Sequence, residues 1–197
     1  MRIIFLLLLP VALIQAKPTY WNQFRGPNGD GDAQNSQLPV QFSENKNLTW
    51  KTPVPGKAWS SPVVKDGKVW ITNAEDDGYK MWAIQLDWRT GKQIKKVLVF
   101  ENKDPQFCHP MNSYATPTPV IEGKMVFVHF GTHGTAALDA KSGMKIWERR
   151  DFKCDHYRGA AASPISHEEN LIIHFDGHDL QYIVCLDQKT GRTIWKK

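Results

Sequence analysis

The sequence predicts an all-β protein made of repeated units, and three features support this prediction. The chain of 197 residues contains 8 Trp, 12 Pro and 14 Gly, a composition rich in aromatic and turn-forming residues. Its apolar runs are short and separated by turn residues, with no sustained helical period. Two sequence blocks recur about 50 residues apart, which is the length of a four-stranded propeller blade. We therefore expect a β-propeller of four-stranded antiparallel blades.

The first residues have the features of a secretory signal peptide. Arg2 precedes an apolar run from Ile3 to Ile14, and Ala16 supplies a small residue for cleavage. The run is shorter than the roughly 20 residues that a spanning helix needs, and an uncleaved anchor is the alternative. We expect residues 1–16 to be removed, leaving an extended N-terminal segment at 17–47 and no transmembrane span. The mature protein would then be periplasmic or extracellular.

The charge of the chain indicates no nucleic-acid partner. The formal net charge is +5, but the basic residues occur as isolated pairs such as Lys95-Lys96 and Arg149-Arg150. Nucleic-acid binding needs basic residues clustered on one face or segment, because affinity comes from many phosphate contacts. A nucleic-acid-binding function is therefore not expected.

The first repeated block begins with a hydroxyl residue followed by proline. A turn and a short apolar strand follow in each copy, and we expect that strand to end ten residues after the proline. The three opening pairs are Ser61-Pro62, Thr118-Pro119 and Ser163-Pro164. The three expected strand ends are Thr72, His129 and His174.

The second repeated block combines an aspartate, a glycine and a tryptophan. An aspartate can cap a turn, glycine tolerates positive φ, and tryptophan on the next strand provides a large apolar side chain. The complete copies are Asp139, Gly143, Trp147 and Asp187, Gly191, Trp195. The first copy has Asp87 and Gly91, but Lys95 stands in the tryptophan position.

This second block resembles the tryptophan-docking motif of the PQQ-like β-propeller repeat family. The family includes quinoprotein alcohol dehydrogenases and BamB-type outer-membrane assembly lipoproteins. The segment Trp21–Gly31 also resembles the start of exported PQQ-like repeat proteins of planctomycete-type bacteria, and the resemblance covers residues 20–197. It implies that Trp147 and Trp195 pack between neighbouring blades.

Propellers of this family have about seven or eight blades, whereas this sequence provides about three. We expect a partial propeller over residues 48–197, with blades at about 58–100, 115–152 and 160–197. Leu48–Lys51 is similar to the outer strand of a further blade. We expect a chain truncated at Lys197; assembly from several chains and a short open arc are the alternatives.

Six of the seven histidines fall on loops that a four-stranded meander brings to one end, which we call the rim. The candidate ligand-binding residues of the rim are Cys108, His109, His129, His133, His156, Arg158, His174 and His178. Histidine and cysteine side chains suit a transition-metal site, but no close-set ligand spacing defines one. The alternative is that equivalent loops share residues by ancestry and form hydrogen bonds within each blade.

The three cysteines leave one unpaired in any arrangement. Cys108 and Cys154 occupy similar positions in adjacent repeats, and an exported setting favours a disulfide between them. Cys185 replaces the small first residue of the docking motif, so we expect a buried thiol there.

We expect an exported, non-catalytic binding or scaffold module with an envelope or extracellular protein partner. The alternative is a quinoprotein dehydrogenase that uses PQQ and Ca²⁺ to oxidise an alcohol or sugar. In the dehydrogenases of this family, PQQ lies on the propeller axis between a tryptophan and a disulfide of adjacent cysteines, near Ca²⁺ held by carboxylates. This sequence has no adjacent cysteine pair, no corresponding carboxylate cluster and no recognisable nucleophile–base arrangement, so no catalytic residue is assigned.

Overall fold

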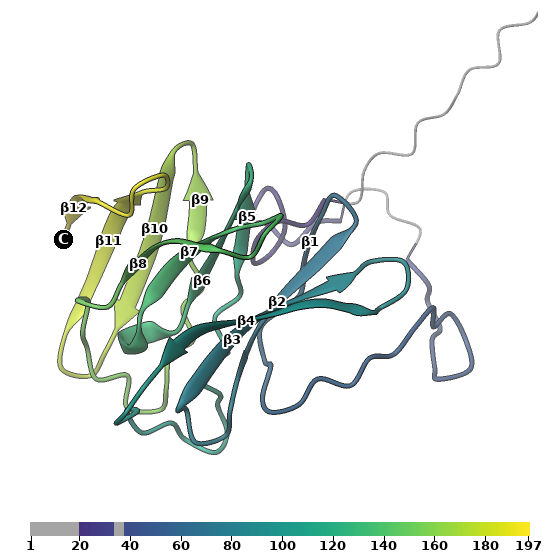
Figure 1. Cartoon of the computed structure of the whole chain (residues 1–197), viewed down its shortest axis with the longest axis horizontal. Helices are drawn as coiled ribbons and strands as arrows, with labels where there is room; N and C mark the ends of the chain where they lie inside the picture. The colour runs from purple at the N-terminus through teal and green to yellow at the C-terminus, as the bar shows by residue number, and fades with distance from the viewer. Residues whose placement is uncertain (1–19, 34–37) are drawn as a thin grey trace, which may run out of the picture.

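The computed structural model describes residues 20–33 and 38–197, which form three four-stranded antiparallel sheets side by side (Figure 1). In each sheet, strands that are neighbours in the sequence are also neighbours in space. The predicted signal peptide lies outside the described residues. Within the described part of the chain, no helix is long and apolar enough to cross a bilayer. The predicted all-β class is confirmed.

The three sheets are similar in size and order. The first contains β1 (Val63–Lys65), β2 (Lys68–Ala74), β3 (Lys80–Asp87) and β4 (Gln93–Glu101). The second contains β5 (Val120–Glu122), β6 (Met125–His129), β7 (Thr135–Asp139) and β8 (Lys145–Arg149). The third contains β9 (Ile165–His167), β10 (Asn170–Asp176), β11 (Gln181–Asp187) and β12 (Thr193–Lys196). A short 3₁₀ turn, η1 (Gly131–His133), separates β6 from β7.

The second strand of each sheet does not always end where the repeat predicts. β6 ends at His129 as expected, because η1 follows directly. β2 and β10 instead continue two residues beyond Thr72 and His174, since pairing with the next strand extends further. The expected strand ends were therefore wrong for two of the three copies.

The aspartate of each docking block caps the turn between the third and fourth strands. In the first sheet, Asp87 Oδ1 accepts hydrogen bonds from the backbone N–H and the hydroxyl of Thr90, both 3.0 Å long. Asp139 and Asp187 make the same pair of bonds to the hydroxyl residue three positions later. These hydrogen bonds lower the pKa of all three carboxyl groups. Local chemistry thus explains why the block recurs.

Tryptophan side chains from one unit pack on the turn glycine of the next. A β-carbon at Gly191 would lie 2.7 Å from Cδ2 of Trp147, so the indole lies directly against the glycine backbone. The Trp147 indole N–H donates to the carbonyl of Gln188, 2.8 Å away. This packing joins the second sheet to the third.

Trp50 makes the same arrangement on the first sheet. Its ring packs on Gly91, and its indole N–H donates to the carbonyl of Trp88 at 2.8 Å. Residues 48–51 are not in a strand, because none of the described strands pairs with this segment. Trp50 therefore makes the docking contact with the first sheet although it is not in a strand.

The outward face of the third sheet is exposed. Trp195, at the docking position of this sheet, is 38% exposed, and Ile165 and Ile183 on the same sheet are exposed as well. By contrast, the cores between the sheets bury large side chains such as Trp70, Phe127 and Phe175. The second sheet has a described sheet on each side, and these two neighbours bury its corresponding side chains.

The hydroxyl residues before the prolines connect the inner strands of adjacent sheets. The Thr118 hydroxyl accepts a 3.0 Å hydrogen bond from the backbone N–H of Ser61. The Ser163 hydroxyl accepts an equivalent bond of 3.0 Å from the N–H of Thr118. The repeated hydroxyl thus has a structural role between neighbouring units.

Three consecutive N-terminal residues each contact a different sheet. The backbone of Trp21 pairs with Val64 on β1. The carbonyl of Asn22 accepts from the N–H of Ile121 on β5 at 2.8 Å, and the Gln23 side chain accepts from Ser166 on β9. This segment therefore links the inner strands of all three sheets (Figure 1).

Candidate functional site

Four connecting segments come together at one end of the sheets and form the rim. They are the β4–β5 loop, the η1 turn, the β8–β9 loop and the β10–β11 turn. Gln106 links three of them: its backbone N–H donates to His133 Nε2 at 3.1 Å, and its side-chain oxygen accepts from the N–H of His156. Its side-chain amide also donates to the carbonyl of Cys154. Sequence reasoning missed Gln106, because no local motif marks it.

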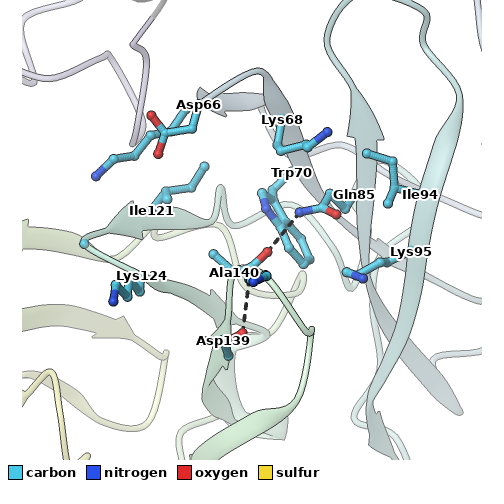
Figure 2. Close-up of a pocket in the computed structure, with 13 residues that line it drawn as sticks. Asp66, Lys68, Trp70, Gln85, Ile94, Lys95, Ile121, Lys124, Asp139 and Ala140 are labelled. Atoms are coloured by element: carbon cyan, nitrogen blue, oxygen red, sulfur yellow. Dashed lines mark hydrogen bonds between the residues drawn. The ribbon is translucent and has the colours of Figure 1, made fainter.

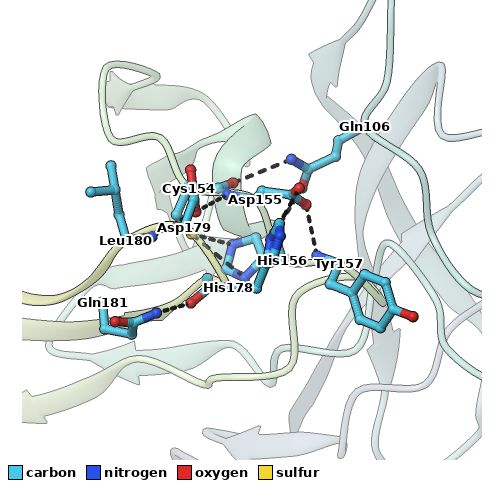
Figure 3. A network of polar contacts seen from close by, with 10 residues as sticks. Gln106, Cys154, Asp155, His156, Tyr157, His178, Asp179, Leu180 and Gln181 are labelled. Carbon is cyan, nitrogen blue, oxygen red and sulfur yellow. Dashed lines mark hydrogen bonds and ion pairs between the residues drawn. The ribbon is translucent and has the colours of Figure 1, made fainter.

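A network of polar contacts holds the β8–β9 loop to the β10–β11 turn (Figure 3). Asp179 Oδ1 accepts from the backbone N–H groups of Asp155 and Leu180, both at 2.7 Å. The Asp155 carboxylate accepts from the N–H of Tyr157 and lies 3.3 Å from His178 Nδ1. The two turns are thereby fixed relative to each other.

Cys154 and His156 lie side by side, and the backbones of both are hydrogen-bonded to Gln106. The Cys154 sulfur is 3.3 Å from His156 Nε2. Burial, and then the nearby Asp179, Asp155 and Asp176 carboxylates, raise the pKa of the Cys154 thiol to about 11. Burial also lowers the pKa of His156. The pair is therefore neutral at pH 7, and a neutral thiol is a poor nucleophile.

His129 is completely buried at the boundary between the second and third sheets. Its Nδ1 is 2.8 Å from the Thr135 hydroxyl, and its ring packs edge-to-face on Phe175 at a centroid distance of 5.3 Å. Nε2 has no hydrogen-bond partner among the described residues. Burial is the main reason that the pKa of His129 falls to about 3, so the ring is neutral at pH 7.

His133 is also held neutral. Its Nε2 accepts from the backbone N–H of Gln106, so Nδ1 carries the proton and donates to the carbonyl of Phe130 at 3.1 Å. Burial lowers the pKa of His133 to about 4. His133 therefore connects the η1 turn to the β4–β5 loop as a neutral hydrogen-bonding group, whereas neutral His129 contacts the neighbouring strand β7.

Acidification is expected to destabilise the protein through these histidines. An unfolded histidine binds a proton below about pH 6.5, whereas folded His129 does so only near pH 3. Its contribution is full above pH 6.5 and is lost as the pH falls toward 3. Urea unfolding at pH 7 to 4 should show His129→Gln with a slope shallower by up to about 1.4 kcal/mol per pH unit. An unchanged slope in this variant would contradict the role of His129.

The remaining predicted rim residues are not all together. The structure brings His129, His133 and His156 close to one another, and places His178 beside Asp155. His109 and Arg158 are on facing loops, where the His109 N–H donates to the Arg158 carbonyl. His174 is separate: it is exposed on β10, paired with Ile183.

The predicted disulfide is not formed, because all three cysteines are free thiols. Cys108 Sγ lies 3.8 Å from the carbonyl of Arg158, whereas Cys154 Sγ faces His156. Cys185 is buried on β11, as expected. Among the described residues, no group of three or more His, Cys, Asp and Glu side chains is placed to hold a metal ion.

Exposed aromatic and apolar side chains surround these buried groups. Met111 is 82% exposed, Phe107 64%, Tyr157 60% and Leu180 53%. Tyr157 also has a φ of 52°, which is uncommon for a residue with a β-carbon. The centroid of its ring lies 5.5 Å from Cζ of Arg158 and 6.0 Å from the centroid of the His178 ring. The histidine-centred sequence reasoning did not identify this surface.

The comparisons with known proteins agree with this fold. The model of the family described as outer membrane protein assembly factor BamB matches residues 37–197. The BamB structure from Moraxella catarrhalis has a TM-score of 0.55 at 20% identity, over 77% of this chain and 41% of that chain. Among curated proteins, none matches the sequence.

Quinoproteins are structurally similar as well. The quinohemoprotein alcohol dehydrogenase from Comamonas testosteroni has a TM-score of 0.54 at 21% identity, over 72% of this chain and 21% of that chain. The enzyme from Pseudomonas putida has a TM-score of 0.53 at 20% identity, over 75% and 21%. These likenesses establish the β-propeller fold, of which this chain spans less than half the length found in BamB.

Proposed function

The chain belongs to the family of the outer membrane protein assembly factor BamB, and on this premise we propose that it is an exported, non-catalytic protein-binding module. The proposed contact surface is the rim, centred on Met111, Tyr157 and Arg158. Export is part of the proposal, because the BamB family description names an outer-membrane process and the sequence begins with a predicted signal peptide.

The composition of the exposed rim is the main support for the proposal. Phe107, Met111, Tyr157 and Arg158 are of the residue types that are enriched in protein–protein interfaces. Aromatic and methionine side chains this exposed bury apolar area when a partner covers them. A protein ligand therefore suits this surface better than a small polar substrate.

The loops that bear these side chains are held in place before any partner binds. The Asn112 side-chain amide donates to the carbonyls of Arg158 and Gly159, at 2.9 and 3.1 Å. Gln106 and Asp179 fix the same loops from the other side. A preorganised surface loses less conformational entropy on association, which favours binding.

In this proposal, the titratable groups of the rim have structural roles. The neutral His129 and His133 imidazoles have hydrogen-bond partners, and the Cys154 thiol is protonated. Although Cys154 lies 3.3 Å from His156, its thiol is protonated and is not activated as a nucleophile. The rim chemistry supports binding rather than catalysis.

The described residues do not fit PQQ held with Ca²⁺. They include no His, Cys, Asp or Glu group of three placed for a metal, and their cysteines are separate free thiols. Reconstitution of the full chain with PQQ and Ca²⁺ is expected to give no dye-linked oxidation of alcohols or sugars; turnover would favour the dehydrogenase alternative.

Site-specific photo-crosslinking tests the rim directly. With p-benzoylphenylalanine in place of Met111 or Tyr157, we expect both positions to crosslink the same discrete protein in cells of the native host. Arg158→Asp should weaken both crosslinks, because it reverses the charge beside Tyr157. The matched control position is Ile146 on the outer strand β8, which is 47% exposed and away from the rim. No crosslink at the rim, or equal crosslinks at Ile146, would overturn the proposal.

A further inference from the structure

A cleft of about 710 Å³ lies between the first and second sheets, at the end opposite the rim (Figure 2). Its lining comes from the β1–β2, β5–β6 and β7–β8 turns, from the start of β4, and from single residues of β2, β3 and β5. The apolar part of the lining includes Trp70, which is almost fully buried, and Ile121 and Ile94. The cleft is therefore large enough for one or two side chains of a ligand and offers them apolar contact.

The cleft lies at the junction where the docking tryptophan is missing. Trp50 packs on Gly91 and Trp147 packs on Gly191, but the glycine of the middle junction, Gly143, faces Val97 and Lys95. A β-carbon at Gly143 would lie 2.9 Å from Val97 Cγ2 and 3.3 Å from Lys95 Cδ. Two narrow aliphatic chains thus replace a broad indole at this junction.

The hydrogen bond of the missing tryptophan is replaced as well. At the other two junctions, the indole N–H donates to the carbonyl of the residue after the capping aspartate. At the middle junction that carbonyl belongs to Ala140, and it accepts from the Gln85 side-chain amide at 3.1 Å. Gln85 thus satisfies this carbonyl without an indole. Val97 and Lys95 fill the space next to Gly143, and the part beside Ala140 remains open as the cleft (Figure 2).

The cleft is also cationic. Lysines from both sheets surround it, namely Lys65, Lys68, Lys95, Lys124 and Lys141. Its two carboxylates are Asp66 and Asp139, and Asp139 already caps its own turn through Ser142. Within the described residues, no carboxylate forms an ion pair with Lys95, Lys124 or Lys141. These ammonium groups are available to an anionic ligand.

We propose that this cleft binds an acidic peptide segment of a partner protein, with an aromatic side chain of that segment in the space left by the missing docking tryptophan. The apolar lining suits the aromatic ring, and lysines on both walls suit flanking carboxylates. The number of lysines favours a peptide with several carboxylates over a small aromatic acid with one. The site is independent of the rim, and each can fail without the other.

The test uses the full chain and a labelled five-residue peptide with tryptophan between two pairs of glutamates. Fluorescence anisotropy should detect binding that weakens with salt, because Lys124 and Lys141 are exposed to solvent. Lys95→Trp fills the cleft with the indole of the other junctions and should weaken binding about tenfold or more. The double variant Lys124→Glu with Lys141→Glu should do the same without touching the cleft floor, since both side chains are exposed.

Matched controls separate this site from general charge attraction. Lys103→Glu removes an exposed lysine at the rim end and should leave binding unchanged. A peptide with alanine in place of tryptophan, and one with lysines in place of glutamates, should bind at least about tenfold more weakly. Equal binding of either peptide, or full binding by both cleft variants, would overturn the proposal. Indole-3-acetate binding as tightly as the acidic peptide would assign the cleft to a small aromatic acid instead.

Discussion

Alanine in place of Trp147 is expected to lower the free energy of unfolding by about 3 kcal/mol. The indole packs on Gly191 and lies 5.9 Å from the Phe127 ring, between centroids, so truncation leaves a cavity at the junction of two sheets. It also removes the 2.8 Å hydrogen bond to the Gln188 carbonyl. Urea unfolding followed by far-UV circular dichroism measures the loss without relying on tryptophan emission.

Trp195 is the matched control for this prediction. It occupies the equivalent position in the third repeat, but it is 38% exposed and has no described sheet to pack against. Trp195→Ala should therefore cost less than about 1 kcal/mol in the same measurement. Equal losses in the two variants would show that packing across the sheet junction is not what Trp147 contributes.

The docking block was predictable because its chemistry is local. An aspartate that caps a turn, a hydroxyl three residues later and a glycine at positive φ interact within one short segment, as at Asp187, Thr190 and Gly191. The hydroxyl–proline pairs were recognised as repeated, but their role was not. Ser61 and Thr118 form a hydrogen bond with each other although they are far apart in the sequence.

Burial at equivalent repeat positions depends on the neighbouring sheet and cannot be read from one repeat. His129 and His174 occupy the same place in successive copies. His129 is buried because Phe175 of the third sheet covers it, whereas His174 has no described sheet on its side. The sequence therefore grouped six histidines on one rim, while packing separates them into buried hydrogen-bonding groups and exposed ones.

Neither the contacts between the rim loops nor the cleft could be predicted from the sequence. Gln106 joins three segments through its backbone and side chain, yet no residue near it in the sequence suggests this. The departure at Lys95 was visible as a missing tryptophan. Its consequence was not, because Gln85, which pairs with Lys95 on the neighbouring strand, reaches across to Ala140 of the second sheet, a contact that only the three-dimensional structure provides.

Gly191→Ala is expected to lower the free energy of unfolding by about 3 kcal/mol, as the sum of backbone strain and overpacking. Gly67→Ala separates the two contributions. Gly67 has a φ of +70°, against +69° at Gly191, but a β-carbon there would meet nothing within 4 Å. This control should therefore cost only about 1 kcal/mol, the price of a left-handed conformation.

A double-mutant cycle identifies the source of the difference between the two glycines. In the Trp147→Ala background, the β-carbon at position 191 no longer meets the indole, so Gly191→Ala should cost about 1 kcal/mol, as at Gly67. The coupling between positions 147 and 191 would then be about 2 kcal/mol. If both substitutions at 191 and 67 cost the same in the wild-type background, the ring does not pack on the glycine. The absence of coupling would likewise contradict direct contact, and the cleft beside Ala140 would lose its explanation as the junction without its tryptophan.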